Sequence, residues 1–183
     1  MRNLLLISGL MLAVLFSISI WAWLALPAGE QIPVHWGPNG EPDRYGGKFE
    51  GLILLPLIAA AVVGLLAVVP RIDPKGENIL RSGKAYRALW IGMLFFFLLL
   101  HAALISSIMG VNVPVEVIVP LGVGILFMVI GNFMGKVRRN YMFGIRTPWT
   151  LASSRSWDKT HRVGGWLFML LGLVIIISSL IGS

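Results

Sequence analysis

The chain has 183 residues, of which 57% are hydrophobic and only 13% are charged, and its mean hydropathy is +0.84. A soluble domain carries about 25% charged residues, so this composition excludes an ordinary soluble protein. The formal net charge of +7 comes from basic residues that flank apolar stretches, which indicates membrane topology and no direct contact with nucleic acid. There is no Cys, which excludes disulfides and thiolate sites.

Five stretches without Asp, Glu, Lys or Arg are each about long enough to cross a bilayer. A helix rises about 1.5 Å per residue, so about 20 residues cross a hydrocarbon core of about 30 Å. We therefore predict an all-α integral membrane bundle of about five transmembrane helices, with an ordered outer loop and an amphipathic cytoplasmic segment. The first stretch is expected to be a true span, because its apolar run exceeds the about 7–15 residues of a signal-peptide core. The stretches are Asn3–Gly29, Gly51–Pro70, Ala88–Val115, Val117–Gly135 and Val163–Ser183.

The distribution of basic residues predicts the orientation. If the N-terminus is cytoplasmic, only Arg44 and Lys48 of the 15 Lys and Arg residues lie outside. Short cytoplasmic loops carry an excess of Lys and Arg, so this orientation is favoured. We expect a multi-pass protein of a bacterial cell membrane, with a cytoplasmic N-terminus and an extracytoplasmic C-terminus.

The spans and loops divide the chain into three parts. Residues 1–70 form a two-helix membrane unit with an extracytoplasmic motif loop at 27–50, and residues 71–87 form a cytoplasmic linker. Residues 88–183 form a three-helix membrane unit with a cytoplasmic motif segment at 136–162. We expect the second helix to end at Pro70 and the third to begin near Trp90. The linker stretch Glu77–Arg87 is typical of a short amphipathic surface helix, with Ile79, Leu80, Ala85 and Tyr86 facing lipid and Arg81, Lys84 and Arg87 meeting anionic headgroups.

The outer loop has more turn-specifying residues than a connection between two helices needs. Ile32–Trp36 is predicted to be a short strand, and Gly37–Gly40 has the pattern of a type I turn. Two interpretations remain open: a docking surface for a ligand or partner, and a compact capping loop that satisfies its own backbone. The candidate binding residues here are Pro33, His35, Trp36, Asn39, Gly40, Asp43 and Lys48.

The inner segment combines aromatic and basic residues. Thr147 before Pro148 is a helix-capping pattern, and Ser153 or Ser154 is an alternative helix start. Trp157 and His161 are four residues apart, so they share a helix face. The segment is either an anchor in the headgroup layer or a polar cytoplasmic pocket or docking surface. The candidate binding residues of this half are Asn132, Asn140, Gly144, Arg146, Thr147, Pro148, Trp149, Thr150, Trp157, Thr160 and His161.

Two strings in the chain resemble known families. GNFMGKVRRNYMFGIRTPWTLASSRSWDKTHRVGGW is similar to the C-terminal signature of the SdpI family of bacterial membrane proteins. IPVHWGPNGEPDRYGGK resembles the signature of a small uncharacterised domain found N-terminal to SdpI regions. The resemblance implies a non-enzymatic immunity and signal-transduction protein that gives resistance to a membrane-active peptide toxin. It implies a secreted peptide as the outer partner and a cytoplasmic repressor as the inner one, and no oligomeric state follows from it.

No catalytic constellation is visible in the sequence. His35, His101 and His161 lie at different depths, so they cannot share a metal, and neither a His-Glu-x-x-His pair nor a Gly-Lys-Ser/Thr loop occurs. We therefore expect no metal, no cofactor and no enzymatic activity. The alternatives are a membrane transporter or lipid-handling protein and, less favoured, a membrane hydrolase using His161 and Asp158. His101 is interpreted as a neutral histidine bonded to a neighbouring helix in preference to a functional proton site.

The predicted topology can be tested in this cysteine-free chain by placing one cysteine at Asn39 or at Ser154. An impermeant thiol reagent added to whole cells should label the first variant and miss the second, because only the outer loop is accessible. Equal labelling of the two variants would contradict the predicted orientation.

Overall fold

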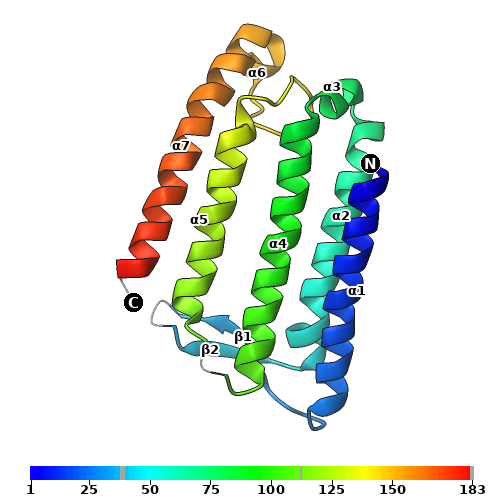
Figure 1. The fold of residues 1–183 in the computed structure, drawn as a ribbon, viewed down its shortest axis with the longest axis vertical. Coiled ribbons are helices and arrows are strands. Elements are labelled where there is room, and N and C mark those ends of the chain that lie inside the picture. Colours follow the sequence, from blue (N-terminus) through cyan, green and yellow to red (C-terminus); the bar gives the residue numbers. More distant parts are fainter. Residues whose placement is uncertain (38–39, 112, 182–183) are drawn as a thin grey trace.

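The computed structural model describes residues 1–37, 40–111 and 113–181, and five of its helices are long and apolar enough to cross a membrane (Figure 1). This confirms the predicted all-α membrane fold. The first, third, fourth and fifth spans are α1 (Arg2–Ala25), α4 (Gly83–Ile108), α5 (Val115–Met134) and α7 (Ser154–Ile181), and the second is a π-helical turn η1 (Phe49–Ile53) that continues as α2 (Leu54–Ile72). The shorter elements are β1 (Ile32–Trp36), β2 (Pro42–Gly46), α3 (Gly76–Arg81) and α6 (Pro148–Ala152).

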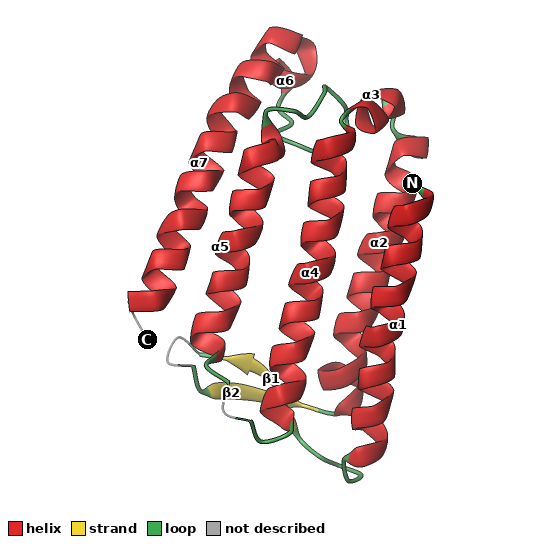
Figure 2. Ribbon diagram, in the orientation of Figure 1, coloured by secondary structure: helices red, strands yellow, loops and turns green. Residues whose placement is uncertain are grey.

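Helix α4 occupies the middle of the bundle. Helices α1 and α2 pack against it and against each other, α5 packs against it as well, and α7 packs along α5. The β-hairpin lies at one end of the helices, and α3 and α6 lie at the other (Figure 2). We call these the hairpin end and the motif end. The N-terminus lies at the motif end, whereas the chain leaves α7 at the hairpin end (Figure 1).

Glycines allow α5 and α7 to approach closely. A Cβ added to Gly131 would lie 2.6 Å from the carbonyl oxygen of Gly165, and one added to Gly124 would lie 2.8 Å from that of Gly172. Both distances are too short for a Cβ to fit, so the two helix backbones are in direct contact at these glycines. Such small-residue contacts commonly hold helices together in a bilayer, because the hydrophobic effect does not drive helix association in lipid.

Two hydrogen bonds inside the bundle join side chains of different helices. The His101 side chain is fully buried, and its Nε2 lies 3.1 Å from Ser19 Oγ, which donates to the Leu52 carbonyl at 2.7 Å. Since a carbonyl can only accept, the hydroxyl proton goes to Leu52, and His101 Nε2 must donate to Ser19. This geometry agrees with the interpretation of His101 as a histidine that links neighbouring helices. Nearby, Trp90 Nε1 donates to Ser8 Oγ at 2.8 Å.

Two expected helix boundaries are wrong. Helix α2 continues through Pro70 to Ile72, although proline has no N–H to donate to the carbonyl of Leu66 four residues earlier. The Tyr86 hydroxyl donates to that carbonyl instead, so the proline leaves no unpaired group in the membrane. Helix α4 begins at Gly83 and not near Trp90, because its first turn packs against the bundle.

The predicted lipid-facing surface helix in the linker is also wrong. Only Gly76–Arg81 forms a separate helix, and Ile79, Ala85 and Tyr86 are buried in the protein, whereas Leu80 is exposed. Ile79 and Tyr86 join a core cluster with Leu4 of α1 and others. The apolar face of this stretch therefore meets other helices instead of lipid.

Candidate functional site

The outer loop is a two-stranded antiparallel hairpin, and the strand predicted at Ile32–Trp36 is its first strand, β1. Its strands pair from Ile32 opposite Gly46 to Trp36 opposite Pro42, with irregular register between Pro33 and Trp36. The Ile32 side chain is fully buried against Ala22, Leu52 and Ile105 of three membrane segments. This side chain anchors the hairpin to the bundle. Pro38 and Asn39, in the predicted turn, lie outside the described residues.

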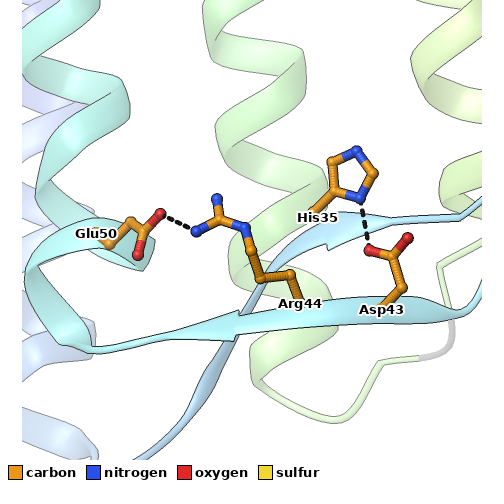
Figure 3. Close-up of polar contacts among 4 residues, drawn as sticks. All are labelled: His35, Asp43, Arg44 and Glu50. Carbon is orange, nitrogen blue, oxygen red and sulfur yellow. Dashed lines mark hydrogen bonds and ion pairs between the residues drawn. The ribbon is translucent and has the colours of Figure 1, made fainter.

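His35, Asp43 and Lys48, which were predicted at the hairpin end, all form polar contacts within the protein. His35 Nδ1 lies 2.5 Å from Asp43 Oδ1 across the two strands, and Arg44 donates to Glu50 at 2.6 Å (Figure 3). Lys48 Nζ donates to the carbonyls of Trp23 and Leu26 at 2.8 Å and 2.5 Å. The last carbonyls of a helix lack partners within the helix, so Lys48 acts as a cap for α1.

A cavity of about 330 Å³ lies between the hairpin, α2, α4 and α5. Trp36 and Val34 of β1 line it from the hairpin side, and the membrane helices contribute aliphatic side chains such as Leu54 and Val119. The Arg44–Glu50 pair supplies its charged part. Of the residues predicted here, Trp36 lines this cavity. Pro33 is half-buried and does not line it, and Gly40, with a φ of +76°, approaches the Glu116 side chain.

At the motif end, His161 is held by the backbone on both sides of its ring. Its Nε2 accepts from the N–H of Ile145 at 3.0 Å, and its Nδ1 lies 2.9 Å from the carbonyl of Trp157. An amide N–H only donates and a carbonyl only accepts, so the ring is neutral with its proton on Nδ1. It is 1% exposed and stacks on Trp157 with ring centroids 4.0 Å apart. Because both nitrogens are engaged, His161 is a structural centre of the segment and not a free base.

The loop packs against His161 at Gly144, where the backbone conformation and the close approach favour glycine. Gly144 has a φ of +108°, and an added Cβ there would lie 2.5 Å from His161 Nε2. Trp157 is fully buried and donates its Nε1–H to the carbonyl of Val137 at 2.7 Å. Asn140, also fully buried, accepts from the N–H groups of Met142 and Phe143 at 2.9 and 2.8 Å. Together these contacts fold residues 137–145 into a fixed loop.

The predicted cap at Thr147 is confirmed, and so is the alternative helix start. Thr147 and Thr150 form a reciprocal capping box at the start of α6, with Pro148 at its first position. Thr150 is fully buried, and its hydroxyl also contacts the carbonyl of Ile145 at 2.9 Å. Ser153 Oγ then accepts from the N–H of Ser156 at 3.3 Å, where α7 begins.

Three residues of the linker hold the motif segment, and sequence reasoning missed all of them. Asp73, only 6% exposed, accepts from the N–H of Lys75 at 2.6 Å and from that of Tyr141 at 2.8 Å. Asn78 donates to the carbonyl of Arg139 at 2.8 Å, and Ser82 Oγ accepts from the N–H of Arg138 at 2.9 Å. The linker has two acids, Asp73 and Glu77, among its basic residues, and nothing in the sequence distinguished Asp73.

The remaining predicted residues form the exposed side of the segment. Arg146 donates to the carbonyl of Tyr141 at 2.8 Å, and Trp149 is 63% exposed. We call Tyr141, Arg146, Pro148 and Trp149, all exposed, the motif surface. Asn132 is exposed on α5 and Thr160 is half-buried on α7, and within the described part of the chain neither side chain forms a hydrogen bond or ion pair with this network.

The two groups of predicted residues lie at opposite ends of the bundle (Figure 1). Within residues 1–37, 40–111 and 113–181, no three His, Asp or Glu side chains are grouped so that they would hold a metal ion. Five membrane-capable helices with a folded hairpin at one end and a folded polar segment at the other define a multi-pass membrane protein.

The comparisons with known proteins agree with the two sequence motifs. Residues 136–183 match the SdpI/YfhL protein family, and residues 10–60 match a domain of unknown function, DUF1648. Both predicted resemblances are thereby confirmed: residues 136–183 are similar to the SdpI/YfhL family, and residues 10–60 are similar to DUF1648. It is also 29% identical over 176 residues to the immunity protein SdpI of Bacillus subtilis (strain 168), an alignment that covers 94% of this chain and 80% of that protein. No solved structure matches the chain.

Both carboxylate oxygens of Asp73 accept from backbone N–H groups, so we expect that a neutral residue of the same shape cannot replace it. Asp73→Asn keeps the shape but replaces one acceptor oxygen with an amide group that faces a backbone N–H. An unpaired buried group costs about 1–3 kcal/mol, so the variant should have a lower free energy of unfolding and faster hydrogen exchange at the Tyr141 amide. Asp158→Asn, the same change at an exposed site, is the matched control. Unchanged stability and exchange in Asp73→Asn would contradict the role of Asp73 in holding the motif segment.

Proposed function

We propose that this protein protects its own cell against a membrane-active peptide and that it does so without catalysis. The observation that carries the proposal is the similarity to an immunity protein, which extends over 94% of this chain and so includes both membrane units. The bonding of His161 supports the non-catalytic part, because a base whose two nitrogens are tied to the backbone is poorly suited to proton transfer.

The hairpin end is the site that we assign to the peptide. Its cavity is walled by aliphatic and indole side chains, with the Arg44–Glu50 pair at the same site. Ligand sites are commonly apolar pockets with a few polar groups that set orientation. An amphipathic peptide would place apolar side chains in the cavity and its backbone or charges against the pair. The charge distribution of the loops favours an orientation with this end outside the cell, where a secreted peptide would arrive.

The motif surface is the site that we assign to a cytoplasmic regulator. Arg and Trp are the residue types that most often dominate protein–protein contacts, and Arg146 and Trp149 are both exposed there. The rigid loop behind them fixes where they point. The basic residues Arg155, Lys159 and Arg162 of α7 are exposed as well, so an acidic surface on the partner would fit.

Helix α4 offers a physical connection between the two sites. Its Ile105 packs in the cluster that holds Ile32 of the hairpin. At its other end, the Tyr86 ring lies 5.5 Å from that of Phe143 in the motif loop. A shift of α4 along its axis would change both contacts. For a peptide to signal in this way, it must bind one arrangement of α4 more tightly than another.

Filling the cavity tests this function. We expect Val119→Trp and Leu54→Trp, introduced from two sides of the cavity, to lower the peptide concentration that stops growth by about tenfold in a deletion strain. A tenfold change corresponds to about 1.4 kcal/mol of lost binding. Growth under challenge with a panel of membrane-active peptides is the measurement.

Val174→Trp, which adds the same side chain at an exposed position of α7, is the control and should protect like the wild type. Membrane levels and thermal stability of all variants are measured in parallel. Full protection by both cavity variants would exclude the cavity as the peptide site. No protection by the wild type against any peptide of the panel, relative to the deletion strain, would count against the immunity function itself.

A further inference from the structure

A second cavity, of about 680 Å³, lies at the motif end between α1, α3 and α4. Arg2 of α1 and Arg87 of α4 line it, and its apolar wall includes Leu4, Ile7 and Ile91. No acidic side chain is among the residues that line it. It is separate from the hairpin cavity, which lies at the opposite end of the helices, and from the motif surface, which shares none of its residues.

The two arginines are available for a ligand. Both are exposed, and neither forms an ion pair with an acid in the part of the chain that the structure describes. The acid of the neighbouring helix α3, Glu77, pairs with Arg81 at 3.3 Å. A guanidinium presents a planar fork of N–H donors that matches two oxygens of a phosphate group. Two unpaired guanidinium groups at one crevice therefore favour an anion.

The order of the residues along the helices matches a molecule with a charged head and an apolar tail. Arg2 lies in the first turn of α1 and Arg87 near the start of α4, so both are at the ends of their spans. Ile7 is five residues further along α1, which is about 7.5 Å deeper at about 1.5 Å per residue. Ile91 is one turn beyond Arg87 on α4. The charged groups thus lie at headgroup level and the apolar wall at acyl-chain level.

We infer that this crevice binds one anionic phospholipid from the leaflet at the motif end. Arg2 and Arg87 hold its phosphate, and the start of one acyl chain lies along Leu4, Ile7 and Ile91. The apolar wall favours a lipid over free phosphate, which has nothing to place there. The two positive charges favour phosphatidylglycerol over a zwitterionic lipid, whose ammonium group would be brought near the arginines. The site is independent of the proposed peptide and regulator sites.

The test is native mass spectrometry of the full chain, released from micelles that contain equal amounts of phosphatidylglycerol and phosphatidylcholine. The wild type should retain one phosphatidylglycerol in preference to phosphatidylcholine. In the double variant Arg2→Gln with Arg87→Gln, the ratio of bound phosphatidylglycerol to bound phosphatidylcholine should fall at least fivefold. The matched control is Arg155→Gln with Arg162→Gln, which removes the same charge from exposed positions of α7 and should keep the preference.

Two further arms distinguish the sources of the effect. Added inorganic phosphate should leave the bound lipid in place, and displacement by it at low millimolar concentration would show an anion site without acyl-chain recognition and overturn the inference. Phosphatidylglycerol should also raise the melting temperature of the wild type and of the control variant but not of the Arg2/Arg87 variant, because a ligand stabilises only the state that binds it. Equal retention of phosphatidylglycerol by the two double variants, or no lipid preference in the wild type, would also overturn it.

Discussion

The hydrocarbon core of a membrane offers no partner for a backbone N–H or carbonyl, and the rest of this structure follows from that constraint. Each span is a helix that pairs its own backbone. At two places where the pairing is interrupted, a side chain from another helix completes it. The Leu66 carbonyl that Pro70 leaves open accepts from Tyr86, and the Leu52 carbonyl in the π-helical turn accepts from Ser19. Polar chemistry is therefore concentrated at the two ends of the bundle.

The motif end shows how the two halves of the chain depend on each other there. The family match begins at residue 136, but this loop is held from outside by the linker of the N-terminal half. Asp73, Asn78 and Ser82 bond to three main-chain positions between Arg138 and Tyr141. Inside the loop, His161 accepts from the N–H of Ile145, and the Thr150 hydroxyl donates to the Ile145 carbonyl. The result is a buried framework that presents Arg146 and Trp149 on a fixed surface.

The sequence predicted the features that depend on residues close together in the chain. Uncharged stretches marked the five spans, the Thr147-Pro148 pair marked a helix start, and the spacing of Trp157 and His161 placed them on one face. It could not predict features that depend on distant partners. The cap that Lys48 forms on α1 needs the carbonyl of Trp23, and the role of Asp73 needs the N–H of Tyr141. Periodicity identified an apolar side near Ile79 but could not tell whether helices or lipid would cover it.

In the proposed mechanism, a peptide at the hairpin end alters the motif segment at the other end. Hydrogen exchange on the protein in nanodiscs, with and without a peptide against which it protects, tests this most directly. We expect changed exchange in two separate regions: residues 32–36 of the hairpin and residues 137–147 of the motif loop. A change confined to the hairpin, with motif-loop amides exchanging at the same rate in both samples, would contradict the coupling and leave protection to the hairpin end alone.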